Sequence, residues 1–154
     1  MTMTMTSKRV GHEVIELVNY CGPVSLETQN TESGDLVYMV SVASDSINIS
    51  FILDRRFPFS PPYQVLVNNK EYLDILKTSI VTLSQLGIEK GFPKCFCCES
   101  LMCADRWNAS VSLVKLFTEI KDVISKKQQI MHIWFSRKLA AEKLTHDIPI
   151  ENYL

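Results

Sequence analysis

Apolar residues recur at two different periods along this chain of 154 residues. From Lys8 onward the period is that of one helix face, and Gly22-Pro23 ends the pattern. The apolar positions of this face are Val10, Val14, Leu17 and Val18. The first stretch is therefore predicted to be a helix, preceded by a flexible polar tail over residues 1–7.

Between residues 24 and 67 the apolar period changes to two, which is typical of strands with one buried face. The predicted strands cover residues 24–28, 36–42, 47–53 and 63–67. The connectors between the first three are short and rich in turn-forming residues, which favours sequential antiparallel pairing. The pattern predicts a four-stranded antiparallel meander.

Helical spacing returns in the second half of the chain. Three more helices are predicted: one over residues 69–86, one with apolar positions from Leu113 to Ile124, and one over about residues 129–145. The middle one follows Trp107 and has the clearest apolar face, and Ser110 or Ser112 is placed to cap it. The order predicts a single α+β domain over residues 8–154, with the C-terminal helices packed on one face of the sheet.

Composition and charge narrow the classes of function. The apolar fraction is 46% and the charged fraction 21%, which are ordinary for a globular protein. A net charge of -1 argues against electrostatic binding to nucleic acid or to an anionic membrane. No apolar run approaches the roughly 18 residues that span a bilayer, and the N-terminus has no apolar signal region. We therefore expect a cytoplasmic or nuclear protein.

Four of the five cysteines fall within nine residues, at Cys95, Cys97, Cys98 and Cys103. In a reducing compartment such thiols are metal ligands, reactive groups or small buried side chains rather than disulfides. Four thiolates suffice for a structural zinc site, but two separated Cys-x₂-Cys pairs are the usual pattern. Adjacent Cys97 and Cys98 in an extended segment point in opposite directions, so binding one ion would require a bend.

Two motifs carry a resemblance to a known family. Phe57-Pro-Phe-Ser-Pro-Pro62 follows the third predicted strand, and Trp107 follows Cys98 by nine positions and leads into a helix. This order resembles the ubiquitin-conjugating (E2, UBC-like) family, in which an aromatic-Pro-Phe-x-Pro-Pro element precedes an active-site cysteine, a Trp-x-Pro-Ala motif and a long helix. The resemblance covers roughly residues 8–127.

The resemblance implies a UBC-like fold and a specific chemistry. Cys98 is in the best register to be the nucleophile, with Cys103 and Cys97 as alternatives. Its thiolate would accept ubiquitin or a ubiquitin-like protein from an E1 activating enzyme and pass it to a lysine with an E3 ligase, without a cofactor. The segment Phe57–Pro62 is called the Pro loop below. Phe59 on this loop, and Lys8 and Arg9 at the start of the first helix, match the family's partner-binding positions.

The chain also departs from the family pattern. The His-Pro-Asn motif, whose asparagine stabilises the oxyanion, is reduced to the proline of Phe92-Pro93-Lys94, and Asn108-Ala-Ser110 replaces x-Pro-Ala. A catalytically inactive variant that binds ubiquitin or another E2 is therefore the second hypothesis. A zinc-stabilised interaction domain, with Cys95, Cys97, Cys98 and Cys103 as ligands, is the third.

Overall fold

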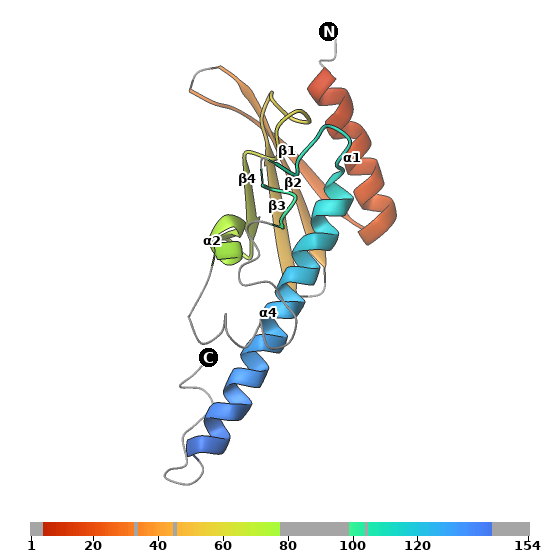
Figure 1. Cartoon of the computed structure of the whole chain (residues 1–154). Coiled ribbons are helices and arrows are strands. Elements are labelled where there is room, and N and C mark those ends of the chain that lie inside the picture. The colour runs from red at the N-terminus through yellow and green to blue at the C-terminus, as the bar shows by residue number, and fades with distance from the viewer. Residues whose placement is uncertain (1–4, 33, 45, 78–98, 104, 143–154) are drawn as a thin grey trace.

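The computed structural model describes residues 5–32, 34–44, 46–77, 99–103 and 105–142. The helices are α1 (Met5–Cys21), α2 (Tyr72–Lys77) and α4 (Leu113–Glu142). The strands are β1 (Val24–Asn30), β2 (Leu36–Ser44), β3 (Ile47–Leu53), β4 (Gln64–Val67) and β5 (Lys70–Glu71). The α+β class predicted from the sequence is confirmed (Figure 1).

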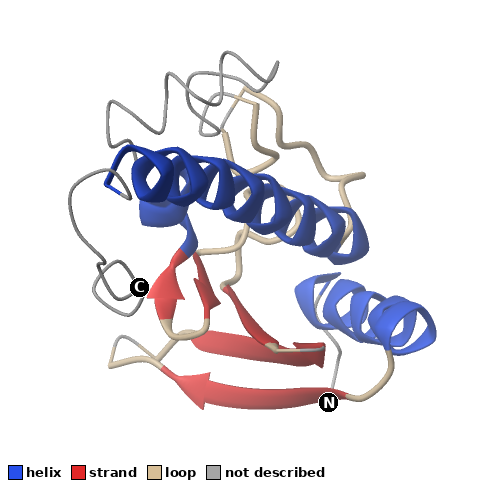
Figure 2. Cartoon of the chain, turned by 90° about the horizontal axis from the view of Figure 1, so that it is seen from below, coloured by secondary structure: helices blue, strands red, loops and turns tan. Residues whose placement is uncertain are grey.

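The five strands form one antiparallel sheet in the order β1-β2-β3-β4-β5. Its register places Val40 opposite Phe51, and Phe51 opposite Val65. All three side chains are fully buried, so the inner face predicted from the period of two is confirmed. The sheet packs against α1 and α4, which lie on the same face (Figure 2).

The predicted number of strands was wrong by one. Asn68 and Asn69 adopt positive φ values of 52° and 67°, the conformation of a tight hairpin turn, and β5 pairs back onto β4. A strand of two residues is too short to show a period. The helix predicted over residues 69–86 therefore begins later, as α2 at Tyr72, and its part beyond Lys77 lies outside the described residues.

The two helices predicted after residue 113 are a single helix, α4, of 30 residues. The polar run Ser125-Lys-Lys-Gln-Gln129 interrupts the apolar face, but its lysines and glutamines favour helix and none is Gly or Pro. Ser112 caps the helix as one of the two predicted candidates, because its hydroxyl accepts the Lys115 N–H at 3.2 Å. The last part of α4 extends past the end of the sheet (Figure 1).

Helix α1 begins at Met5, so residues 5–7 belong to its first turn although they were expected in the tail. The Thr6 hydroxyl lies 3.1 Å from the carbonyl oxygens of both Arg55 and Phe57, which ties this turn to the Pro loop. Val18 belongs to the predicted apolar face and Glu13 does not, yet their burial is the reverse of this expectation. Glu13 is buried and Val18 is 44% exposed, because α1 is covered on one flank by α4.

The helices of the described residues include none that is long and apolar enough to cross a membrane.

Candidate functional site

The Pro loop and the tryptophan, 49 residues apart in sequence, are in direct contact. The Trp107 indole N–H donates to the Pro58 carbonyl oxygen at 2.8 Å, and the Trp107 and Phe57 rings lie 6.1 Å apart. Both rings are buried. The two motifs that carry the family resemblance therefore form one unit in the structure.

Replacing Trp107 by phenylalanine tests how much the hydrogen bond to Pro58 contributes to stability. The variant keeps an aromatic ring beside Phe57 but loses the donor to Pro58, so we expect the free energy of unfolding to fall by about 1 kcal/mol. Urea denaturation followed by circular dichroism measures it. An unchanged midpoint would show that the hydrogen bond contributes nothing to holding the Pro loop.

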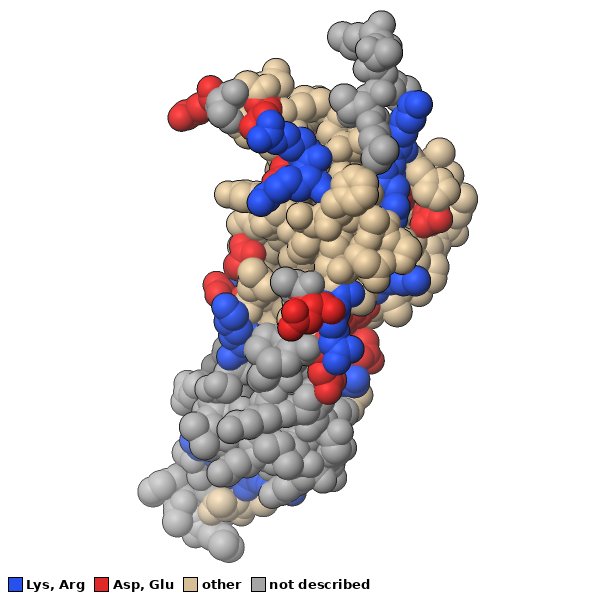
Figure 3. Space-filling model, turned by 45° about the horizontal axis from the view of Figure 1, so that its top comes forward, with Lys and Arg blue, Asp and Glu red and all other residues tan. Residues whose placement is uncertain are grey.

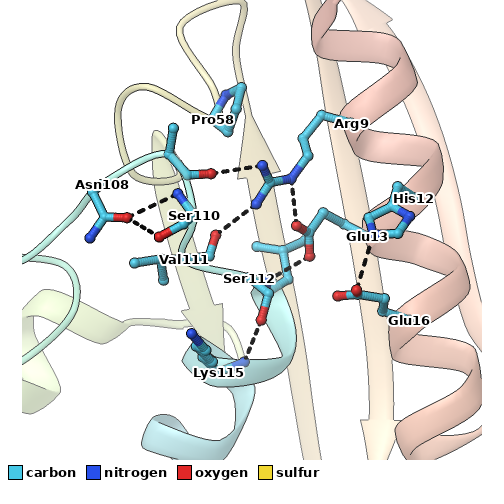
Figure 4. A network of polar contacts seen from close by, with 12 residues as sticks. Arg9, His12, Glu13, Glu16, Pro58, Asn108, Ser110, Val111, Ser112 and Lys115 are labelled. Carbon is cyan, nitrogen blue, oxygen red and sulfur yellow. Dashed lines mark hydrogen bonds and ion pairs between the residues drawn. The ribbon is translucent and has the colours of Figure 1, made fainter.

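A second network joins α1 to the segment that follows Trp107 (Figure 4). The Arg9 guanidinium donates from Nη1 to the Ala109 carbonyl at 2.7 Å and from Nη2 to the Val111 carbonyl at 3.0 Å. Its Nε donates to Glu13 Oε1 at 2.7 Å, and its carbon lies 5.9 Å from the centre of the Phe57 ring. Arg9 thus links α1, the Pro loop and the chain entering α4.

Glu13 completes this network. Its other carboxylate oxygen accepts the Leu113 N–H at 2.9 Å, which is an amide at the start of α4. The side chain is only 1% exposed, so its charge is compensated by the Arg9 guanidinium and by the positive end of the α4 dipole. The carboxylate fixes the beginning of α4 on α1.

The two residues at the start of α1 that were expected to bind partners, Lys8 and Arg9, lie in different environments. Lys8 is exposed. All the contacts given above commit the Arg9 guanidinium to groups of its own chain. Arg9 is therefore a structural link, with 24% of its side chain exposed, and its predicted role in partner binding stays a prediction.

A carboxylate on α4 fixes the segment between Cys98 and Cys103. Glu119 accepts hydrogen bonds from the Tyr72 hydroxyl at 2.7 Å, the Ser100 hydroxyl at 2.7 Å and the Leu101 N–H at 2.6 Å. The Ser100 hydroxyl in turn accepts the Met102 N–H at 3.1 Å. Burial, and then the hydrogen bond to Glu119, raise the pKa of Tyr72 well above its ordinary value, so this phenol stays a donor.

Among the clustered cysteines the structure describes Cys103 only. It is half-buried and sits in a turn, where its N–H donates to the Ser100 carbonyl at 3.0 Å and its carbonyl accepts from the N–H groups of Arg106 and Trp107. The predicted nucleophile Cys98 and its neighbours Cys95 and Cys97 lie outside the described residues. The part of the chain that is described holds no group of three His, Cys, Asp or Glu placed to bind a metal ion.

Phe59 projects from the Pro loop with 69% of its surface exposed, and Tyr63 just beyond it is 66% exposed. Arg55 and Arg56 are exposed at the start of this loop, paired with Asp35 at 3.4 Å and Asp54 at 2.8 Å respectively. Figure 3 shows a broad uncharged surface flanked by Lys and Arg on this end of the molecule. The aromatic pair is available to a partner.

Two residues of the site escaped prediction from the sequence, Glu13 and Glu119. Glu13 had a signal in the spacing of four from Arg9, which is that of a helical ion pair. Glu119 lies at the flank of the apolar stripe of α4, directly before Ile120, and looks like any solvated carboxylate there. Only the folded chain brings Tyr72 and Ser100 to it.

No family model, curated protein or solved structure gives a significant match to this chain.

Proposed function

We propose that the chain has a UBC-like fold and acts as an E2-type ubiquitin-conjugating enzyme, with Cys98 as the residue that carries the modifier. The observation that supports this most is the contact between the Pro loop and Trp107, made by the 2.8 Å hydrogen bond to Pro58. It joins the two motifs of the resemblance in one place. The order of a first helix, an antiparallel meander, the Pro loop and a long helix after the tryptophan agrees with it.

The proposed chemistry has two transfers. In the first, the Cys98 thiolate attacks the carbonyl carbon of the modifier's thioester on the activating enzyme. A new C–S bond forms, and the activating enzyme's cysteine leaves as a thiolate. In the second, a lysine amine attacks the same carbon, the C–N bond forms, the amine loses a proton and Cys98 leaves as a thiolate. Glu119 supports the site by fixing Ser100 and Leu101, close behind Cys98 in sequence.

One observation supports the second hypothesis, that of a catalytically inactive E2-like protein. The second transfer needs a positioned donor to the oxyanion, and two asparagines of the described chain have their side chains held elsewhere through the amide oxygen. Asn68 exchanges hydrogen bonds with the Asn48 backbone at 2.7 and 2.8 Å, and the Asn108 side-chain oxygen accepts from the N–H and hydroxyl of Ser110. An E2-like adaptor that binds ubiquitin or a partner E2 is therefore the second candidate function.

The test is incubation of the purified chain with activating enzyme, ATP and a panel of ubiquitin-like modifiers. We expect an adduct of chain and modifier that disappears on treatment with a thiol reductant, as a thioester does. The absence of an adduct with every modifier would overturn the catalytic proposal in favour of the adaptor, which binds ubiquitin without a covalent bond. Stoichiometric zinc in the purified protein would instead support the zinc-stabilised domain.

Phe59 is proposed as the anchor for the E3 ligase. Replacing it by alanine removes an exposed side chain, so folding should be unaffected while E3-dependent transfer falls by at least about tenfold. Discharge of the thioester onto lysine, measured with and without the ligase, separates the two effects. Leu73→Ala removes another exposed apolar side chain, on α2, and is the matched control. Equal rates for both variants would exclude Phe59 as the anchor.

A further inference from the structure

Strand β1 is an edge of the described sheet, paired with β2 alone. It is seven residues long and exposed at every position after Val24. Edge strands are commonly protected by proline, lysine or a bulge. The sequence Val-Ser-Leu-Glu-Thr-Gln-Asn contains no proline or lysine and only one charge, Glu27.

The pairing with β2 determines which backbone groups of β1 point outward. Antiparallel pairs alternate between hydrogen-bonded and non-hydrogen-bonded, and the Thr31 N–H donates to the Asp35 carbonyl at 2.8 Å at the hairpin end of the ladder. Counting back from Thr31, the odd-numbered residues bond to β2. The residues whose N–H and C=O groups point away from the sheet are therefore Val24, Leu26, Thr28 and Asn30.

Exposed apolar side chains accompany these backbone groups. Leu26 lies opposite the buried Val40, so its side chain is on the helix-covered face of the sheet, yet it is 44% exposed. Helix α1 packs on β1 and β2, and its side chains Ile15 (61%) and Val18 (44%) are exposed. A strand added to this edge would cover Leu26 while satisfying the outward backbone groups.

We propose that β1 pairs antiparallel with β1 of a second copy of this chain, in a two-fold arrangement centred on Leu26. Only outward-facing residues can exchange hydrogen bonds across such a joint. Centring on Leu26 places the two Leu26 side chains together, Val24 opposite Thr28, and Glu27 opposite Ser25. The joint then has an apolar centre and no opposed charges.

The two registers centred further along the strand, on Glu27 and on Thr28, are worse. Centring on Glu27 sets two carboxylates directly opposite each other in a close pair, which is destabilising. Centring on Thr28 faces Leu26 with the polar Asn30. Charge and the apolar match therefore favour the register centred on Leu26 over these two, and the two copies of α1 lie on the same face beside it.

This interface is small, since it is built from one strand and one helix flank of each copy. Interfaces below about 1,200 Å² in total are usually weak, so we expect association at micromolar concentrations or above. Sedimentation equilibrium from about 1 to about 300 μM measures it. The mass should rise from 17.6 kDa toward twice that value across this range.

Two variants test the edge itself. Thr28→Pro removes an outward N–H without touching the ladder to β2, and Thr28→Val keeps that N–H. Leu26→Lys brings two charges together at the centre of the joint, whereas Gln29→Lys adds the same charge on the opposite face of β1. We expect Thr28→Pro and Leu26→Lys to be monomers and the two controls to dimerise as the wild type does.

Circular dichroism melting shows whether each variant is folded. If Thr28→Pro does not fold, Leu26→Lys alone decides the test. A wild-type chain that stays monomeric up to the highest concentration would overturn the proposal. A dimer that persists in folded Leu26→Lys would also overturn it, because its interface would lie elsewhere. Neither outcome depends on conjugating activity.

Discussion

Glu13→Ala is expected to lower the free energy of unfolding by about 3 to 5 kcal/mol, the usual cost of removing one partner from a buried ion pair. The carboxylate is almost fully buried and holds the Arg9 guanidinium and the Leu113 N–H at the start of α4. Its removal leaves the buried Leu113 amide without its acceptor and the partly buried Arg9 guanidinium without its counter-charge. Urea denaturation curves of wild type and variant give the difference.

Glu16→Ala is the matched control, one turn further along α1. Glu16 pairs at 3.0 Å with His12, and both side chains are substantially exposed. Its removal should change the free energy of unfolding by no more than about 0.5 kcal/mol. Equal losses for the two variants would contradict the structural role given to Glu13.

The strands were well predicted from the sequence, because a sheet with one buried face imposes a period of two. Val40, Phe51 and Leu53 fall on that face as expected. Strand β5 was missed because two residues carry no period, and its turn depends on Asn68 and Asn69 in a left-handed conformation. Local pattern is informative only over a length that samples both faces of an element.

The prediction for the helices was wrong in the opposite way, because it divided one helix into two. A polar run in the middle of α4 interrupts the apolar stripe, since that part of the helix reaches the end of the sheet, but it does not interrupt the helix. The burial of Glu13 could not be predicted from its neighbours in sequence. Its partner Leu113 is 100 residues away, so the carboxylate reads from sequence as part of the solvated face of α1.

The candidate site was predicted in part. The Pro loop and Trp107 were recognised as motifs, and the exposure of Phe59 agrees with a role in binding. The structural contacts of Arg9 were not predicted, because the carbonyl groups of Ala109 and Val111 that it binds come from a distant part of the chain. The convergence of Tyr72 and Ser100 on Glu119 is likewise a product of the tertiary structure.

The second large effect concerns Cys98, the proposed nucleophile. Cys98→Ala is expected to abolish the adduct with the modifier, because the alanine methyl group cannot form an ester of any kind. Cys103→Ala should retain the adduct, since Cys103 lies in the turn between Ser100 and Trp107 and is not in the register of the nucleophile. Gel electrophoresis without reductant measures both. The reverse pattern would move the nucleophile to Cys103.

The most direct test of the proposed function is the fate of the adduct in Cys98→Ser, with Cys103→Ser as control. A serine hydroxyl at the accepting position forms an oxygen ester, which thiols do not cleave, in place of the thioester. We predict that the Cys98→Ser chain accumulates an adduct that survives reductant and is released by alkali, while Cys103→Ser forms the ordinary reductant-sensitive one. An adduct in Cys98→Ser that remains sensitive to reductant would place the modifier on another cysteine and contradict the assignment.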